Sequence, residues 1–573
     1  MVMVSTEWAC GMDGKSYQAK LCFTTTTNLQ CKVENPGIFQ TQMGFVSPGV
    51  CGCPNNCNNQ TIDGFSKGVC QPSGTCQCIK GWTGDDCSTA DCSKSSQTCL
   101  GNGKCGSVED SDVCQCKTGW TGDDCSVPLV PITPVKSTIP STQYSSWDNY
   151  GNNHPIFNES TIATIHLTID DSDLLFLLNP DNKQSDTYVK SGFLFYNQII
   201  SQQWDDLGVR LHGGLSRSFV KKSWKLSFDA FNKGRTWKQI SKLQLKSMAI
   251  DPSYEREKMS MDVYYSMNVP IQRGSFCQLF VNDINYGLYM MIEDVDNQFL
   301  NSRFNNDDGL LYKCVGDLSY IGSDPDLYRN LTLPGPNHQP AYDPQTDQAE
   351  ESFSMLEKLI SIINLSPNST FPSDIQSIFD VDLFIRTLVA EIATGQPEGM
   401  FDANNYFLYF NPDLKVFQFF RHDLDDSWGL WNTYRLMDVR NVFQWFQGGR
   451  GYRLPERILS VPSFRSSFIS YFQKLLSVYF VNQSSSTLVQ RMQQMHTMIL
   501  PLAFSDEWHH LDYAWSFSDV SNSLTLNISR PTLSPFPFPS LETLSLLNFL
   551  SRRSSSAASQ LSSPPSSPSR ILL

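Results

Sequence analysis

The sequence predicts an α+β fold in which small disulfide-rich modules precede a curled antiparallel sheet and a helical lobe. Sixteen of the 18 cysteines lie between Cys10 and Cys125, as expected for disulfide-bonded modules with little core of their own. Alternating apolar residues then predict strands from about residue 160, and apolar residues at helical spacing predict helices from about residue 351. With 573 residues and 40% hydrophobic content, the chain has enough material for several domains.

The composition narrows the class of function and the compartment. A formal net charge of −14 without a long Lys/Arg run argues against nucleic acid as the main partner, and no segment is apolar enough for a membrane span. The cysteine density indicates an oxidising compartment. Because the N-terminus, MVMVSTEWAC, has neither a basic region nor an apolar run, we expect an extracellular or secreted protein whose signal peptide is missing from this chain.

Two cysteine-containing stretches repeat one pattern, 76-CQCIKGWTGDDC-87 and 114-CQCKTGWTGDDC-125. The pattern resembles the epidermal-growth-factor-like module, which would make residues 53–87 and 88–126 two such modules. A zinc site is the weaker alternative, because the spacing does not form a regular pair of C-x2-C motifs. The pairing in that family implies six disulfides: Cys53–Cys70, Cys57–Cys76, Cys78–Cys87, Cys92–Cys105, Cys99–Cys114 and Cys116–Cys125.

A further cysteine-containing segment occupies residues 1–52. Its stretch 10-CGMDGKSYQAKLC-22 resembles the centre of a Kazal-type domain, with one extra residue after Tyr17. A Kazal framework has two more cysteines upstream of the position that Cys10 would take. The resemblance therefore implies a partial domain in a chain whose true start is missing.

The composition changes again after Cys125. Residues 127–158 are rich in Pro, Ser and Thr and predict an extended linker. We therefore expect the large domain at residues 159–562, followed by a disordered Ser/Pro-rich tail at 563–573.

Seven N-x-S/T sequons permit glycosylation of a secreted protein. About that number would occur by chance in a chain so rich in Asn, Ser and Thr, so they do not by themselves indicate secretion. They begin at Asn59, Asn158, Asn330, Asn364, Asn368, Asn482 and Asn527.

The first elements of the large domain are a strand at 162–169, a helix at 170–178, and a strand, Gly-rich turn and strand at 208–229. In the last strand Lys222 is in phase with large apolar residues, and a buried ammonium without a partner is costly. From the pattern alone, a lysine whose head reaches solvent at the sheet edge is the more frequent explanation. Lys221 and Lys225 belong to the other face and are expected to be solvated.

The next elements complete the expected sheet. Residues 251–270 predict a helix with charged residues along one side, and residues 276–296 predict a hairpin with a polar turn at 282–285. A short helix at 299–304 and a strand at 310–313 follow. This order predicts a curled antiparallel sheet that carries one long helix.

The second half is predominantly helical. Residues 351–365 and 381–395 show apolar stripes at helical spacing, and Gly395 would cap the second helix. Two strands at 405–410 and 415–420 then form a hairpin.

The second strand of that hairpin runs directly into three carboxylates in 417-FQFFRHDLDDSWGL-430. Such a cluster is either solvated or neutralised by a cation, because like charges this close repel each other. A D-x-D after a strand is, on pattern alone, more often a solvated turn.

The order of these motifs resembles the CotH kinase family, known from bacterial spore coats and from surface proteins of moulds. The resemblance covers about residues 160–562, including a weaker match to the closing helix of the family at 548–561. The matching stretches are RLHGGLSRSFVKKSWKL (210–226), DPSYEREK (251–258), NYGLYMMIEDVD (285–296) with LLYK (310–313), and NNYFLY (404–409) with HDLDDSWG (422–429).

The resemblance implies an atypical kinase-like, two-lobed domain that binds ATP with Mg²⁺ or Mn²⁺. Its acceptors would be Ser or Thr residues of Ser-rich secreted or coat proteins. Phosphoryl transfer needs carboxylates for the metal and a base or orienting group for the attacking hydroxyl. Asp423 and Asp425 are the expected metal ligands, whereas Asp426 would point away.

Four further residues are implied to bind the cofactor. Lys222 and Arg217 would pair with phosphate, although the solvated alternative remains open for both. Glu293 would orient a lysine or the nucleotide, or would simply end a strand in solvent. Asn405 would be a second metal or phosphate ligand.

The expected catalytic group departs from the family pattern. Glu398 stands where the family has an Asp before the N-N-Y motif, and one extra methylene displaces a carboxylate by about 1 Å, which can lower a rate by about 100-fold. Asp402 is the alternative catalytic residue. His422 replaces a common Trp, and an ordinary histidine beside a carboxylate is favoured over a direct chemical role.

Two other functions remain open at this point. The first is a catalytically impaired cell-surface or matrix adhesion protein that binds partners through its epidermal-growth-factor-like modules, and Glu398 favours it. The second is a metal-dependent glycosyltransferase, which rests on the D-x-D alone. The retained D-x-D, lysine and Asn405 together favour the kinase.

Overall fold

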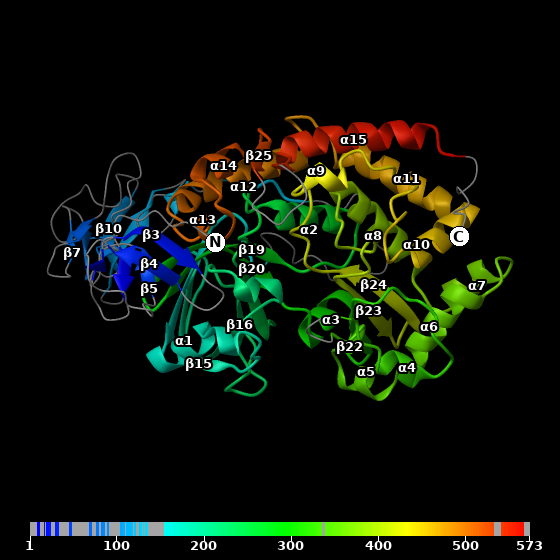
Figure 1. The fold of residues 1–573 in the computed structure, drawn as a ribbon, viewed down its shortest axis with the longest axis horizontal. Helices are drawn as coiled ribbons and strands as arrows, with labels where there is room; N and C mark the ends of the chain where they lie inside the picture. Colours follow the sequence, from blue (N-terminus) through cyan, green and yellow to red (C-terminus); the bar gives the residue numbers. More distant parts are fainter. Residues whose placement is uncertain are drawn as a thin grey trace.

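A computed structural model describes residues 154–334, 339–531 and 540–565, together with short segments between residues 9 and 135. Figure 1 shows a strand-rich half, drawn in cyan and green, beside a helical half that runs from green to red. The predicted α+β class is confirmed.

The strand-rich half is a closed barrel of seven strands in the order β14-β15-β16-β17-β18-β20-β19. The curled antiparallel sheet that we predicted is therefore wrong in one respect. The parallel pair β14 and β19 joins the two edges, so the sheet closes into a barrel rather than forming an open kinase-type lobe. The strands are β14 Ala163–Ile169, β15 Val189–Tyr196, β16 Ser201–Leu211, β17 Trp224–Ser227, β18 Lys242–Lys246, β19 Gly274–Val281 and β20 Ile284–Glu293.

A second, four-stranded sheet lies in the helical half and has the order β22-β21-β23-β24. Its strands are β21 Leu310–Cys314, β22 Tyr342–Pro344, β23 Tyr406–Asn411 and β24 Val416–Arg421. Helix α8 (Val381–Thr394) packs on β24 and on α11 (Pro462–Val478). Asp380 caps its first turn by accepting from the Leu383 amide, and Gly395 ends it in the left-handed conformation, as the sequence predicted.

Helix α2 (Arg256–Ser266) carries the predicted charged residues, and the structure buries them along with nearly all of the helix. Its charges are neutralised inside the protein. Lys258 lies 2.7 Å from Asp262, and Arg491 on α12 (Thr487–Phe504) contacts Asp262 at 2.8 Å and Glu159 at 2.9 Å. Lys258 also pairs with Glu159, so removing one member would leave this buried network with one uncompensated charge, which costs about 3–5 kcal/mol.

The remaining helices surround these two sheets. Helix α15 lies along one edge of the helical half, beside α11 (Figure 1). Within the described residues, no helix is both long and apolar enough to cross a membrane. The helices are α1 Asp171–Leu178, α3 Asn297–Phe304, α4 Pro325–Arg329, α5 Asp347–Glu351, α6 Ser354–Leu365, α7 Phe371–Gln376, α9 Asn432–Arg435, α10 Arg453–Ser460, α13 His510–Tyr513, α14 Phe517–Asn522 and α15 Leu546–Ser562, and strands β25 Ile528–Pro531 and β26 Ser540–Thr543 form a separate hairpin.

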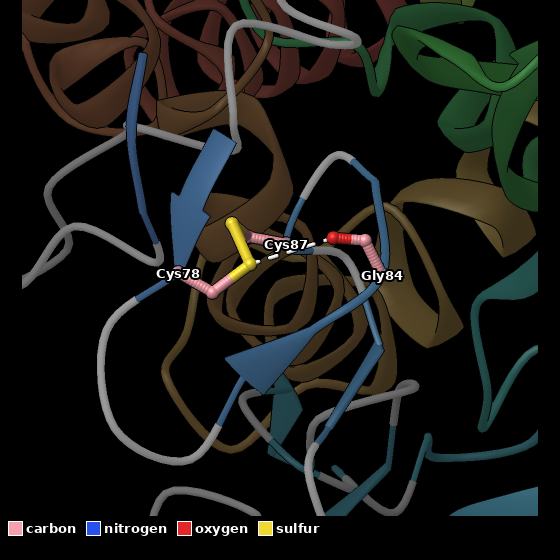
Figure 2. Close-up of a disulfide and its surroundings, with 3 residues drawn as sticks. All are labelled: Cys78, Gly84 and Cys87. Carbon is pink, nitrogen blue, oxygen red and sulfur yellow. Dashed lines mark hydrogen bonds between the residues drawn. A yellow bond between two sulfur atoms is a disulfide. The ribbon is translucent and has the colours of Figure 1, made fainter. Parts of the chain in front are cut away.

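The N-terminal part contributes short antiparallel hairpins, among them β6 (Gly68–Cys70) with β7 (Cys76–Cys78) and β10 (Gly103–Val108) with β11 (Ser111–Cys116). Figure 2 shows the disulfide between Cys78 and Cys87 beside Gly84. The Cys87 amide donates to the Gly84 carbonyl at 3.2 Å. This is one of the six implied pairs. Each of the other five includes a residue whose side chain lies outside the described part, as does the Kazal-like segment.

Part of the expected linker packs against the large domain. Ile132 is buried, the Thr133 amide donates to Gln494 at 2.8 Å, and the Thr133 carbonyl accepts from Arg491 at 2.6 Å. Residues 132–135 are therefore an extended segment attached to α12 rather than a free spacer.

Candidate active site

The candidate site lies where the end of β18, the first turn of α2 and the loop after β24 meet. The Lys246 Nζ atom lies 2.6 Å from Glu257 Oε2, 2.5 Å from Asp423 Oδ1 and 3.4 Å from Asp425 Oδ2. We call these four residues the acid cluster. One ammonium thus faces three carboxylates contributed by two distant parts of the chain.

The acid cluster has a buried floor and an open edge. The Glu257 side chain is 1% exposed, whereas Asp425 is 18% and Asp423 is 42% exposed. Asp423 and Asp425 can therefore contact a ligand that enters from solvent, whereas the buried Glu257 cannot.

Electrostatics leave the cluster short of positive charge. Burial disfavours the ammonium, but the three carboxylates outweigh it and raise the pKa of Lys246 well above its usual value. Burial also opposes ionisation of Asp423, yet Lys246 holds the pKa of Asp423 well below its usual value. Burial, together with the neighbouring Asp423 and Glu257 charges, raises the pKa of Asp425 well above its usual value. The cluster therefore favours either a bound proton or a second cation.

A second group of carboxylates adjoins the first. Burial raises the pKa of Glu398 to about 7, and the Asp426 and Asp423 charges add to this effect. Burial also raises the pKa of Asp402. Asp426 forms an ion pair with Arg435 on α9 and has no ion pair with the ammonium of the acid cluster. Glu398 is thus set to exchange a proton near neutral pH.

The loop that carries Glu398 is held by two buried residues. Glu391 on α8 accepts from the Met400 amide at 2.8 Å. Arg421, at the end of β24, donates to the carbonyls of Asn404 at 2.5 Å and Glu398 at 3.2 Å. These contacts fix the loop to the same hairpin that presents Asp423 and Asp425.

Two residues at this end of the hairpin have the left-handed backbone conformation, Asn405 with φ 52° and Asp423 with φ 57°. They are connected through His422, the residue before Asp423, whose amide donates to the Asn405 carbonyl at 3.2 Å. Asn and Asp adopt this conformation more readily than other residues that carry a side chain. The His422 ring packs on Phe407 with centroids 4.8 Å apart, and burial lowers its pKa well below the usual value.

The structure does not bring Lys222 and Arg217 into the acid cluster. The Lys222 ammonium donates to the carbonyls of Arg217 at 3.0 Å and Phe219 at 2.5 Å, within its own loop. The Arg217 guanidinium lies 2.5 Å from Asp186. Both cations therefore support the loop between β16 and β17.

Glu293 is neither solvated nor beside a lysine. It is 1% exposed and lies 2.5 Å from Arg273 and 2.6 Å from Arg303, and although burial opposes ionisation, these guanidinium groups lower its pKa to about 2. On β18 its partner is Leu243, three residues from Lys246, which places it roughly 10 Å along the strand from the acid cluster.

The prediction that Lys221 and Lys225 are solvated is wrong. Lys221 is fully buried and lies 2.6 Å from Asp506, and Lys225 lies 2.6 Å from Asp294. For Lys221 the strand pattern was extended too far, because β17 begins only at Trp224 and the alternation of faces does not hold in the preceding loop. Lys225 does lie in β17, where its ion pair with Asp294 takes the place of solvent.

Lys246 and Glu257 were not predicted as site residues from the sequence. Lys246 ends the alternating stretch K-L-Q-L-K, where nothing distinguishes it from a solvated lysine at a strand end. Glu257 lies within the DPSYEREK motif, and its position in that motif was the available signal.

A comparison with protein families matches residues 209–525 to the family described as CotH kinase protein. This range covers more than half of the chain and includes every residue of the acid cluster as well as Glu398, Asp402 and Asn405.

Curated relatives come from a bacterium and a mould. The chain is 26% identical to inner spore coat protein H of Bacillus subtilis (strain 168) over 314 residues, which cover 55% of this chain and 82% of that protein. It is 23% identical to invasin CotH3 of Rhizopus delemar over 408 residues, covering 67% of this chain and 64% of the invasin. Spore coat protein homolog 1 of the same mould is 22% identical, with 67% and 62% covered. The chain thus spans less than two thirds of these mould relatives.

Proposed function

Because this chain belongs to the CotH kinase protein family, we propose that it is an atypical protein kinase, secreted or held at a cell surface. It would transfer the γ-phosphate of ATP to Ser or Thr residues of extracellular or coat proteins. The observation that carries the proposal is the acid cluster, in which Lys246 meets Glu257, Asp423 and Asp425 beside a glutamate whose pKa is about 7.

The donor set fits Mg²⁺ or Mn²⁺. These ions prefer one or two carboxylates with phosphate oxygens and water, and Asp423 and Asp425 are the two carboxylates of the cluster that solvent reaches. Among the described residues, no three His, Cys, Asp or Glu side chains are grouped to hold a metal ion by themselves. A metal here would therefore complete its shell with phosphate oxygens and water. When bound, it would neutralise phosphate charge during the transfer.

The protein residues divide the remaining work. Lys246 holds the two aspartates in place and offsets part of their repulsion. Glu257 holds Lys246 through an ion pair on the buried side of the cluster. Glu398 would accept the proton of the attacking hydroxyl, because a base with a pKa near the working pH is most effective. Asp402 is the alternative base.

Asn405, Arg217 and Lys222 are the proposed contacts to the nucleotide and its metal. Asn405 borders the cluster through its backbone contact with His422 and would contact metal or phosphate. Arg217 and Lys222 would reach a phosphate only by exchanging their hydrogen bonds to backbone carbonyls.

The relatives support a location outside the cell. Their names place them in a spore coat or describe them as invasins, which suggests a coat or surface protein for this chain as well. We extend the proposal to the N-terminal part, whose epidermal-growth-factor-like and Kazal-like segments would contact cell-surface or matrix partners.

A direct assay tests the kinase. The purified protein is incubated with γ-labelled ATP, Mg²⁺ or Mn²⁺ and a Ser-rich acceptor, beside the Asp423→Ala variant. We expect label on Ser or Thr with the wild-type protein and a loss of at least 100-fold in Asp423→Ala. Equal labelling by both proteins would exclude the proposed site.

A second function, a surface adhesion protein without turnover, is favoured by Glu398 in the place of the family aspartate and by the invasin relatives. Nucleotide binding without any transfer of label, combined with binding to host cells or matrix, would support it over the kinase.

A further inference from the structure

Residues 505–515 leave α12 and lie against the barrel, and we call this segment the strap. Its first anchor is Asp506, a fully buried carboxylate. Asp506 accepts from Lys221 Nζ at 2.6 Å, from the Leu288 amide at 2.9 Å and from the Tyr254 hydroxyl at 2.9 Å. Its partners belong to the barrel and to the segment before α2, so the anchor connects the two halves of the domain.

Aromatic contacts fix the strap further. The Trp508 indole donates to the Asn285 carbonyl at 2.8 Å, and its ring stacks on Tyr286 with centroids 4.6 Å apart. The His509 ring stacks on Tyr254 at 4.1 Å. These contacts fix the first half of the strap to the barrel and to Tyr254. A group that the second half of the strap binds is therefore held in place as well.

The second half of the strap holds a loop of the barrel. One oxygen of Asp512 accepts from the Val220 amide at 2.7 Å, and the other accepts from the Lys221 amide at 3.0 Å. Both amides belong to the loop between β16 and β17, at residues 212–223, which has no strand partner at this point. A carboxylate that accepts from two consecutive amides forms charge-assisted hydrogen bonds, which are about twice as strong as neutral ones.

The same loop is adjacent to the acid cluster. At its end, Ser223 Oγ accepts from the amide of Ser247, the residue after Lys246, at 3.0 Å. Phe219 packs edge-on against Tyr513 with centroids 5.6 Å apart. Burial raises the pKa of Tyr513 to about 12, and the charges of Asp512 and, further away, Asp425 contribute, which places this ring within the field of the cluster.

We propose that Asp512 is a positioning residue that fixes the 212–223 loop relative to Lys246, Asp423 and Asp425, and so determines how tightly the nucleotide is held. The inference rests on the proposed function for its consequence and on the strap contacts for its geometry. Within the described part of the chain, both hydrogen bonds of the Asp512 carboxylate go to this loop, so we assign Asp512 no part in the chemical step. Its loss should therefore weaken nucleotide binding more than it slows transfer.

The test compares Asp512→Asn with Asp519→Asn in the full chain. An Asn at 512 offers one oxygen and turns an NH2 group toward an amide that needs an acceptor. Asp519 is a matched control, because it also accepts from a backbone amide, that of Ser516 at 2.7 Å, but in the cap of α14. Asp512→Glu keeps both carboxylate oxygens, so it should show only part of the change that Asp512→Asn causes.

Two measurements are made on each variant. We expect amide hydrogen exchange at residues 219–221 to become about tenfold faster in Asp512→Asn and to stay unchanged in Asp519→Asn. The KM for ATP should rise about fivefold to tenfold in Asp512→Asn, with kcat within about twofold of the wild-type value.

Unchanged exchange at 219–221, or an equal change in both Asn variants, would overturn the proposal that Asp512 fixes the loop. A fall in kcat at constant KM would overturn its role in nucleotide binding. If the wild-type protein binds no nucleotide and transfers no phosphate, the proposed function fails, and hydrogen exchange alone then decides whether Asp512 holds the loop.

Discussion

Replacing Lys246 by methionine removes the cation that faces three carboxylates, and its effect can be worked out from the structure. Glu257 is 1% exposed, so it loses an ion pair at 2.6 Å in a buried setting. Asp423 is 42% exposed, so solvent screens most of its loss. Removal of one partner of a buried pair costs about 3–5 kcal/mol, and we take about 3 kcal/mol at pH 7 because part of the cluster is solvated.

The destabilisation should depend on pH in a definite direction. Burial already raises the pKa values of Glu257 and Asp425, and loss of Lys246 raises them further. A carboxyl group whose pKa is higher in the folded than in the unfolded protein binds more protons when folded, so its penalty grows as pH rises and is relieved as pH falls. The deficit at pH 7 should therefore shrink by at least half at pH 5.

Thermal unfolding measures this. For a domain of about 400 residues, 3 kcal/mol corresponds to a fall in Tm of about 3–5 °C. The control is Lys242→Met at the other end of β18, which makes the same charge change outside the cluster and should alter Tm by less than about 1 °C. Equal effects of the two substitutions, or a deficit of the same size at pH 5 and pH 7, would refute the reasoning.

Three further predictions use the same geometry. The rate of phosphoryl transfer should rise with pH through about 7, where Glu398 loses its proton, and Glu398→Gln should remove this dependence and lower kcat by about 10²–10⁴, as a pH–rate profile would show. Arg421→Met should lower stability by about 3–5 kcal/mol in urea unfolding, because it leaves Glu391 buried and frees the Asn404 carbonyl; a loss below 1 kcal/mol would contradict this. In a secretory eukaryotic host, mass spectrometry should find glycan on the exposed Asn368 but not on the half-buried Asn364, whose amide nitrogen donates to two carbonyls at 2.8 and 2.7 Å. Glycan on Asn364 would show that these two hydrogen bonds are dispensable.

Local patterns predicted the local elements. The hairpin β23–β24, the cap of α8 at Gly395 and the strand pair at 276–296 follow from periodicity and turn residues within about 20 positions. Closure of the barrel depends on the parallel pairing of β14 with β19, more than 100 residues apart, and no local pattern encodes such a pairing.

The site was predicted in part for the same reason. Asp423, Asp425 and Glu398 lie in short motifs whose carboxylates indicate metal binding or proton transfer. Lys246 can be assigned to the site only from its contact with Asp423, which lies 177 positions later in the chain. The environment of Lys221 was predicted wrongly, because side-chain direction in an irregular loop does not follow the alternation of the strand that succeeds it.

Metal binding in the presence of nucleotide tests the central claim most directly. Electron paramagnetic resonance can follow Mn²⁺ titrated into the protein with a non-hydrolysable ATP analogue, for the wild-type protein, Asp425→Asn and Asp426→Asn. We expect one nucleotide-dependent Mn²⁺ site that weakens at least tenfold in Asp425→Asn and changes less than about twofold in Asp426→Asn, because Asp426 pairs with Arg435. Equal affinities in the wild-type protein and Asp425→Asn would contradict the assignment of the acid cluster as the metal and nucleotide site.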